Sequence, residues 1–268
     1  MCLIVHNSVN SGAIAQQWTR RLTLVEKDEV NRLYLELGSE SRLDILRALK
    51  VKDYKMRELG RHLDLTATEA FRQVTRLIEA KLIQRSPEGS YTLTPYGRLV
   101  LQLSASHEFI FKHNDYFLAH DLSRLPYPFV NRIGELSQAS LSMNSYENIA
   151  RGEEMVSQAK QFFWAMVEGP GNERLPVAAG VKYRFLLPES LISTGSSPLG
   201  SAHSIEVKGL SDIPAIIALT EKEASVFFYL LNGREDYAGF IAKDASSLNW
   251  AKDLFQYCWD KGKSSLQV

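Results

Sequence analysis

Polar side chains able to hydrogen-bond to nucleic-acid bases recur between residues 66 and 76. The segment reads TATEAFRQVTR. Arg and Gln can make paired hydrogen bonds to guanine and adenine edges in the DNA major groove, and Thr can contact a phosphate or a thymine methyl group. A Glu would repel phosphate unless it accepts from a cytosine amino group or orients an Arg. The candidate DNA contacts of this segment are Thr66, Thr68, Glu69, Arg72, Gln73, Thr75 and Arg76.

These groups can act together only if the segment is a helix with one buried side. Thr66 can cap such a helix, and the spacing predicts a helix over 66–80. A turn at DLTAT and a shorter helix over about 55–63 should precede it. A polar outer face is also typical of any solvated amphipathic helix, so neighbouring elements must decide its meaning. The expected buried face consists of Ala70, Val74, Leu77 and Ile78.

A β-hairpin is predicted directly after this helix, over residues 83–94. Pro87, Glu88 and Gly89 provide its turn. The polar tip could reach a minor groove or a phosphate, and basic residues near the preceding helix suit phosphate contacts. The candidates from these two elements are Lys55, Arg57, Arg85, Ser90 and Tyr91, with Lys52 and Arg61 as further phosphate contacts.

Two further helices are expected before the helix over 55–63, because residues 28–50 divide at Gly38 and Ser39 can cap the second piece. The order of helix, helix, helix–turn–helix and hairpin is that of a winged helix. Two alternatives follow. One is a sequence-specific regulator of double-stranded DNA, with recognition helix 66–80 and wing 83–94. The other is a protein-interaction module that does not read DNA. The apolar positions are Val30, Leu33, Tyr34 and Leu37, then Leu43, Ile45, Leu46 and Leu49.

Thr94 and Pro95 predict the start of a long helix that continues to about residue 122. Its apolar seam could pack on its own domain or on a second copy of the chain. Pro126 and Pro128 end the helix. The predicted divisions are an extension over 1–27, a winged-helix domain over 28–104, a connecting helix over 105–125 and an α/β domain over 126–268. The seam consists of Leu99, Leu103, Ile110 and Phe117.

The second half predicts a mixed α/β domain, which makes the whole chain α+β. A helix over about 147–167 should bury Met155, Ala159, Phe162, Phe163 and Met166. GVKYRFLLP, SIEVKGL, AIIALT, SVFFYLL and YAGFIAKD read as strands, and residues 190–204 as a polar loop. A final helix over about 246–263 should bury Ala251, Leu254, Phe255 and Cys258.

The composition excludes several classes of protein. Lys plus Arg equals Asp plus Glu at 31 each, so any basic surface must be local. No apolar run approaches the roughly 20 residues of a membrane span. Only Cys2 and Cys258 occur, which favours a reduced cytoplasmic protein without a disulfide framework.

No catalytic or metal-binding pattern stands out, so we expect no enzyme activity, no metal and no cofactor. His113 and His120 share one helix face but lie about 10 Å apart, too far to chelate one ion alone. His107 points elsewhere. Tyr183 and Arg184, beside the polar loop, are candidate contacts for an anionic ligand.

The stretches LGSESRLDILRAL, LGRHLDLTATEAFRQVTRLIEAKLI and GSYTLTPYGRLVL resemble the ArsR-like winged-helix regulators, in particular their archaeal branch. The segments FVNRIGELSQASL, GVKYRFLLP and WAKDLFQYCWDKG are similar to the C-terminal sensor half of that branch, which is named after a methanogenesis regulatory protein. The resemblance implies a dimeric transcriptional regulator with an unknown small-molecule effector or protein partner. The paired cysteines with which many such regulators sense metals are missing from residues 55–65.

The second half also resembles a half-unit of the phospholipase D-like fold. Such enzymes need a Lys two residues after the catalytic His, and here Ile205 stands two residues after His203. The resemblance therefore implies the fold without its catalytic motif.

Overall fold

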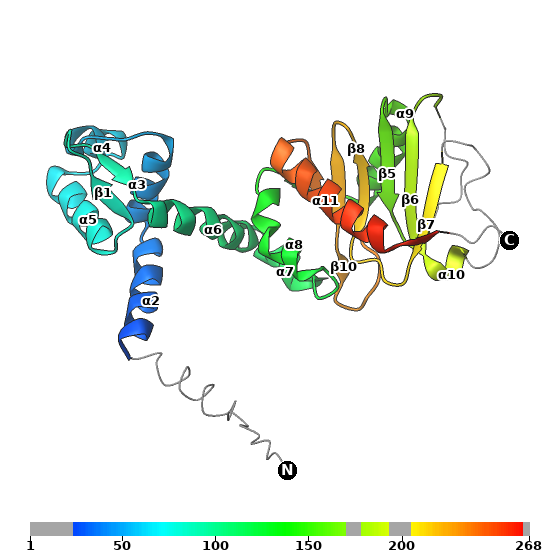
Figure 1. Cartoon of the computed structure of the whole chain (residues 1–268), viewed down its shortest axis with the longest axis horizontal. Coiled ribbons are helices and arrows are strands. Elements are labelled where there is room, and N and C mark those ends of the chain that lie inside the picture. The colour runs from blue at the N-terminus through cyan, green and yellow to red at the C-terminus, as the bar shows by residue number, and fades with distance from the viewer. Residues whose placement is uncertain (1–23, 170–177, 193–204, 265–268) are drawn as a thin grey trace, which may run out of the picture. The chain divides into compact units, whose positions relative to one another are not determined.

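The chain is an α+β protein, as predicted, with a helical first unit and a sheet-rich second unit (Figure 1). The computed structural model describes residues 24–169, 178–192 and 205–264. The first compact unit ends at Gln102 and the second begins at Leu103. The predicted loop over 190–204 falls mostly outside the described residues, as do Cys2, His203 and most of the extension over 1–27.

The first unit has the predicted order of elements. Helices α2 (Leu24–Leu37), α3 (Glu40–Val51), α4 (Met56–His62) and α5 (Ala67–Glu79) come first. Strands β1 (Ile83–Arg85) and β2 (Tyr91–Leu93) then pair antiparallel, and α6 (Pro95–Lys112) follows. Gly89 has a φ of +85°, which suits glycine at the hairpin turn. Fully buried residues from α3, α4, α5 and the start of the hairpin form the core: Ile45, Leu46, Leu59, Leu77 and Leu82.

Two helix starts in this unit use the predicted caps. The Thr66 hydroxyl accepts from the Glu69 backbone N–H, and the Thr94 hydroxyl accepts from that of Gly97. Ser39 occupies the N-cap of α3 but makes no side-chain cap hydrogen bond.

Some predicted buried positions of the first unit are exposed. Ile78 was predicted to lie on the buried face of α5 but is 40% exposed. It lies about 70° from the centre of the buried stripe formed by Ala70, Val74 and Leu77. On α2, Val30 and Tyr34 are also exposed.

The long helix predicted through residue 122 is interrupted at His113, and this prediction was wrong. Helix α6 ends at Lys112, α7 covers Asn114–Ala119, and His120–Asp121 form strand β3. The Asn114 side chain accepts from the Asp115 backbone N–H, an interaction that competes with a continuous helix. Strand β3 pairs antiparallel with β10 (Tyr229–Leu230), so residues 120–121 have an extended conformation and do not continue the helix.

The second unit is built on an eight-stranded sheet with strand order β12-β7-β6-β5-β8-β9-β11-β4. Strands β5, β6 and β7 are parallel, and every other neighbouring pair is antiparallel. Short elements complete the unit: α8 (Tyr127–Asn131), η1 (Ile133–Leu136) and α10 (Glu189–Ile192). The strands are β4 (Ser140–Ser142), β5 (Phe162–Met166), β6 (Lys182–Pro188), β7 (Ile205–Leu210), β8 (Ile216–Thr220), β9 (Ala224–Phe227), β11 (Gly239–Ala242) and β12 (Lys263–Ser264).

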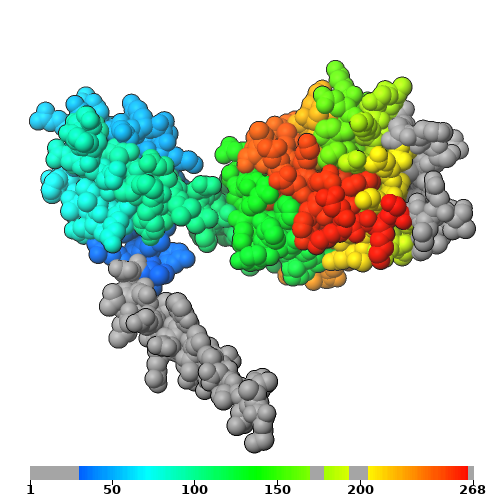
Figure 2. Space-filling view, in the orientation of Figure 1, coloured from blue at the N-terminus to red at the C-terminus, as the bar shows by residue number. Residues whose placement is uncertain are grey.

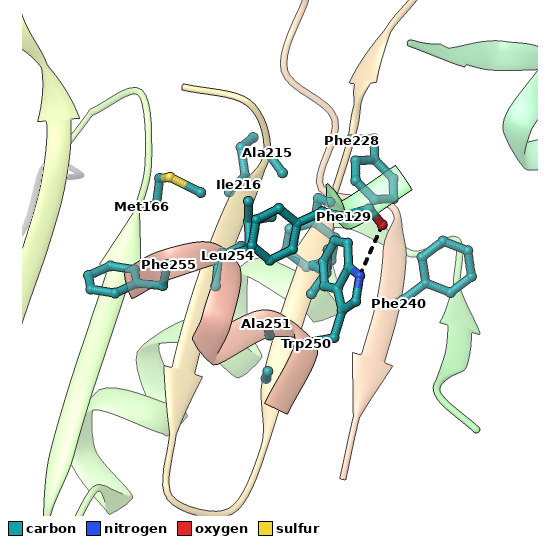
Figure 3. Close-up of a cluster of buried hydrophobic side chains, with 14 of the residues drawn as sticks. Phe129, Met166, Ala215, Ile216, Phe228, Phe240, Trp250, Ala251, Leu254 and Phe255 are labelled. Carbon is teal, nitrogen blue, oxygen red and sulfur yellow. Dashed lines mark hydrogen bonds between the residues drawn. The ribbon is translucent and has the colours of Figure 1, made fainter. Parts of the chain in front are cut away.

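Two helices cover opposite faces of this sheet (Figure 1). Helix α11 (Ala245–Lys261) packs on one face and buries the four predicted residues. Its Trp250 indole donates to the Phe129 carbonyl at 3.2 Å within an aromatic core (Figure 3). Helix α9 (Ser145–Gln158) contributes Met155 and Val156 to a second buried cluster.

The helix predicted over 147–167 was too long, because Phe162–Met166 form strand β5. Helix α9 ends at Gln158, and the Glu221 carboxylate accepts from the backbone N–H groups of Lys160 and Gln161 just beyond it. The aromatic and apolar run that follows pairs with β6 on one side and β8 on the other.

Candidate nucleic-acid interface

The outer surface of α5 carries a ridge of polar side chains. Thr68, Arg72 and Thr75 lie within about 50° of the direction opposite the buried face, at about 100° per residue. Arg72 is exposed and makes no hydrogen bond or ion pair among the described residues. Thr75 donates to the Phe71 carbonyl at 2.8 Å, which fixes its side chain. Figure 2 shows the surface of α5 (cyan) on the outside of the first unit.

Thr66 and Glu69 form a capping box at the start of α5. The Thr66 hydroxyl donates to Glu69 Oε2 at 2.8 Å, and the Thr66 backbone N–H donates to the same oxygen at 3.2 Å. These hydrogen bonds lower the pKa of the Glu69 carboxyl. The anionic side chain therefore holds the helix start, and both residues are already engaged within the protein.

Gln73 and Arg76 lie in a network that faces α2 and α3. Gln73 is buried, and its Oε1 accepts from Arg42 Nη1 at 2.9 Å. Arg76 binds Glu36 through Nη2 at 2.6 Å and through Nε at 3.3 Å. The hydrogen bond to Glu36 raises the pKa of the Arg76 guanidinium. In this arrangement Gln73 cannot make the paired hydrogen bonds to adenine that its residue type suggested, because its side chain is buried with the amide oxygen turned toward Arg42.

Sequence reasoning missed Glu36 and Phe71. Glu36 has a fully buried side chain although it lies beside apolar positions of α2 that are exposed. Its only signal in the sequence is a carboxylate with Arg42 six residues later. Phe71 is 63% exposed on α5, next to Arg72. An exposed aromatic on this face was visible in the sequence as an apolar residue off the buried stripe, and its ring suits a thymine methyl group.

The hairpin presents part of the predicted set. Arg85 is exposed, and its guanidinium lies near Gly89 at the tip. Ser90 is half-buried, with its backbone N–H donating to the Ser86 hydroxyl. Tyr91 packs in the core, and its backbone exchanges hydrogen bonds with Tyr54. The Tyr91 side chain is therefore buried and does not form part of the surface that could contact DNA.

Basic residues surround α4 as the sequence suggested. Lys55 and Arg57 are exposed at its first turn. Lys52 and Arg61 line an open hollow of about 620 Å³ together with Tyr54, Glu58 and His62. The Lys52 ammonium lies 4.8 Å from the centre of the Tyr54 ring, which stacks on His62. These cations are free to approach phosphates.

Tyr183 and Arg184, the predicted ligand contacts, already bind other residues of the second unit. Tyr183 is buried, and its hydroxyl accepts from the Ala178 backbone N–H. Arg184 binds Glu206 at 2.8 Å and lies between the rings of Trp164 and Trp259. In Figure 2 the end of α11 (red) lies beside β7 (yellow), the strand that carries Glu206.

A cavity of about 280 Å³ lies beyond the carboxyl ends of β6 and β7. Its charged residues come from several segments, and Lys261 alone among them has no carboxylate partner within the described chain. Lys261 Nζ donates to the Tyr257 hydroxyl at 2.6 Å. Burial raises the pKa of the Cys258 thiol at the cavity wall to about 12. The lining is Arg124, Pro126, Glu189, Leu210, Ser211, Asp212, Pro214, Tyr257, Cys258, Lys261 and Lys263.

The histidines of the predicted connecting helix are packed separately. His120 is buried, stacks on Tyr116 and lies 3.0 Å from the Asp236 carboxylate. His113 contacts Phe109 and Phe240, and burial lowers its pKa. Across residues 24–169, 178–192 and 205–264, no three His, Cys, Asp or Glu side chains gather as a metal site. Helices in the same ranges include none that is long and apolar enough to span a membrane.

The family-model match lies in the first part of the chain. Residues 31–110 match the family model described as the HVO_A0261 N-terminal domain, which covers less than a third of the chain. The search of curated proteins found no match. The description of this family does not mention ArsR-like regulators, so the ArsR-like assignment stays a prediction.

Solved structures resemble the chain only weakly. TrmBL2, described as an archaeal chromatin protein with a novel mode of DNA binding, is 14% identical with a TM-score of 0.37, covering 82% of this chain and 91% of that one. The methyltransferase SibL is 11% identical with a TM-score of 0.28, covering 72% and 65%. PigF with SAH is 18% identical with a TM-score of 0.25, covering 69% and 61%. At these scores the similarity carries no argument about function.

Proposed function

We propose that the chain is a cytoplasmic, sequence-specific DNA-binding transcriptional regulator of the winged-helix type. Helix α5 would enter the major groove, and the hairpin of β1 and β2 would act as the wing. The observation that carries the proposal is the outward ridge of Thr68, Arg72 and Thr75, in which the Arg72 guanidinium makes no hydrogen bond among the described residues. A guanidinium on that face whose N–H groups are not used within the protein can make paired hydrogen bonds to a guanine.

The surroundings of α5 support this assignment. Lys55 and Arg57 at the start of α4, and Arg85 on the hairpin, supply exposed positive charge on both flanks of the helix–turn–helix. Phosphate contacts of this kind fix the register of a reading helix on the duplex. The overall chain has no net charge, so these local cations would provide the electrostatic attraction.

The active form would be a homodimer. The exposed side of α6 carries Leu99, Leu103 and Ile110, three of the four residues of the predicted seam. The fourth, Phe117, lies on α7 and packs against the core of the second unit. Leaving the three exposed side chains in water costs free energy that pairing with a second copy would recover. Two copies would bind half-sites about one helical turn of DNA apart.

An effector would act through the second unit. The cavity beside Lys261 is the site we favour, because the carboxyl ends of parallel strands are common places for ligand binding. A small anion with an apolar part would pair with the Lys261 ammonium and rest on Leu210 and Pro214. Binding would alter the spacing of the two reading helices and hence the affinity for DNA. We assign no catalytic role to the chain.

The salt dependence of DNA binding separates this function from the alternative of a protein-interaction module. Fluorescence anisotropy of a labelled duplex, titrated with the full chain at several salt concentrations, gives the slope of log affinity against log salt. A DNA reader loses affinity with a slope of about −0.9 for each phosphate contact. No binding at low salt, or a nearly flat slope, would favour the interaction module.

A further inference from the structure

One side of α5 presents apolar groups to solvent. Phe71 is 63% exposed and Ile78 is 40% exposed. Ala67, one turn before Phe71, is exposed as well. At about 100° per residue these three residues lie within about 40° of one another, so they form a continuous line along the helix. We call Ala67, Phe71 and Ile78 the apolar strip.

The apolar strip adjoins the outward ridge of Thr68, Arg72 and Thr75. Around the helix, Phe71 lies about 40° from Thr75 and about 100° from Arg72. The Thr75 hydroxyl donates to the Phe71 carbonyl at 2.8 Å, so its single hydrogen is used within the helix. The largest group that this side of α5 offers to a partner is therefore the ring of Phe71.

The packing of the first unit does not account for Phe71. Helix α5 joins the buried core through Val74 and Leu77, and Phe71 lies outside that core. A single exposed apolar residue is ordinary, but this ring belongs to a strip and directly precedes Arg72 in the chain. A partner that covers the Arg72 guanidinium also meets the Phe71 ring, so both residues contact the same molecule.

The major groove of DNA presents one apolar group, the C5 methyl of thymine, and Phe is among the side chains that contact it. The ends of two side chains about 100° apart on a helix of about 10–12 Å diameter lie roughly 8–9 Å from each other. Successive base pairs are about 3.4 Å apart. Phe71 would therefore meet a base pair about two or three steps from the one read by Arg72.

We propose that Phe71 is a specificity-determining residue that reads the methyl group of a thymine, which deepens the function proposed above and rests on it. The Phe71 ring packs on the methyl group while the Arg72 guanidinium hydrogen-bonds to a guanine nearby. The other three bases lack this methyl group, so each of them buries less apolar surface against the ring. The operator therefore contains a thymine at a fixed distance from the guanine.

Replacing single thymines by deoxyuridine tests this assignment, because the replacement removes the methyl group and leaves the base pairing intact. The wild-type chain first selects a duplex from a random pool, and each thymine of that duplex is then replaced in turn. Fluorescence anisotropy measures the affinity of the full chain for each duplex. We expect one replacement in a half-site to weaken binding about 3- to 5-fold, as for one methyl group no longer buried. Its position should lie about two or three base pairs from the guanine that Arg72→Ala ceases to distinguish.

Phe71→Ala identifies the ring as the group that contacts the methyl. The variant should fold, because Phe71 lies outside the core, and circular dichroism checks this. We expect it to bind the thymine duplex and the sensitive deoxyuridine duplex with affinities within about 1.5-fold of each other, since the two changes remove the same contact. Tyr146→Ala is the matched control. It removes an aromatic side chain of α9 that is 88% exposed in the second unit, and should keep the difference between the duplexes.

Three results would overturn the proposal while leaving the DNA-binding function intact. In the first, no replacement of a thymine weakens binding by the wild-type chain. In the second, the sensitivity to deoxyuridine persists in Phe71→Ala, so another side chain contacts the methyl group. In the third, Phe71→Ala keeps the wild-type preference for DNA but dissociates a dimer in sedimentation velocity, which assigns the ring to a protein interface. A wild-type chain that enriches no motif is a separate result, which contradicts the proposed function and this inference with it.

Discussion

The backbone of Gly97, in the first turn of α6, lies directly against the carbonyl of Leu82 at the start of the hairpin. A Cβ added at position 97 would fall far inside van der Waals contact with that oxygen and its carbon. The Thr94 hydroxyl reinforces this junction, since it donates to the Lys81 carbonyl at 2.7 Å and accepts from the Gly97 backbone N–H. The contact fixes the start of α6 against the end of the α5–hairpin connection.

Gly97→Ala should therefore destabilise the protein. We expect a loss of about 2–4 kcal/mol in the free energy of unfolding, because backbone atoms on both sides must move apart. Urea denaturation followed by circular dichroism measures the change. Gly152→Ala is the matched control, since a Cβ there meets nothing within 4 Å and α9 should gain up to about 1 kcal/mol. Equal stabilities of the two variants would contradict this description of the junction.

Arg72→Ala and Lys55→Ala should affect DNA binding in different ways. Losing Arg72 should relax preference at one base position by roughly 1–3 kcal/mol, whereas losing Lys55 should weaken all sequences alike and reduce the salt slope by about one. Competition binding with duplexes that carry single base changes measures both effects. If both variants weaken all sequences equally, the orientation assigned to α5 is wrong.

Leu103→Glu should favour the monomer. Leu103 is 59% exposed in the single chain, so the substitution costs little in folding but places a charge in the proposed interface. Sedimentation velocity should show a shift to the monomer at micromolar concentration, whereas Val51→Glu, at another exposed apolar position, should leave the dimer intact. A monomeric wild type at high concentration would rule out the seam as a dimer interface.

Lys261→Gln should weaken binding of a small carboxylate. Fluorine NMR of 4-fluorobenzoate with the full chain should show saturable binding, weakened roughly tenfold or more in the variant because a charge-assisted hydrogen bond is lost. Lys252→Gln, an exposed lysine of α11 outside the cavity lining, should bind as wild type does. Saturable binding that is unchanged in Lys261→Gln would place the ligand elsewhere.

The sequence predicted those parts of the fold that depend only on residues close to one another in the chain. The capping residues Thr66 and Thr94, the turn at Gly89 and the buried stripe of α11 each depend on residues close in the chain. The strand at Phe162–Met166 was missed because its identity depends on pairing with β6 and β8, while the preceding helical pattern continued into it.

The candidate site shows the same distinction. The outward direction of Arg72 follows from helical periodicity alone, and the structure has it exposed. The engagement of Gln73 and Arg76 depends on Glu36 and Arg42, which lie more than 30 residues away in the sequence. The residue types of one helix do not show which side chains of another helix they bind. Both Gln73 and Arg76 were therefore predicted to be available for contacts with DNA.

Selection of bound duplexes from a random pool by the full-length protein tests the central claim most directly. The account predicts an enriched motif containing a guanine read by Arg72, repeated as two half-sites about one helical turn apart. A pool that stays random after repeated rounds at low salt would contradict it.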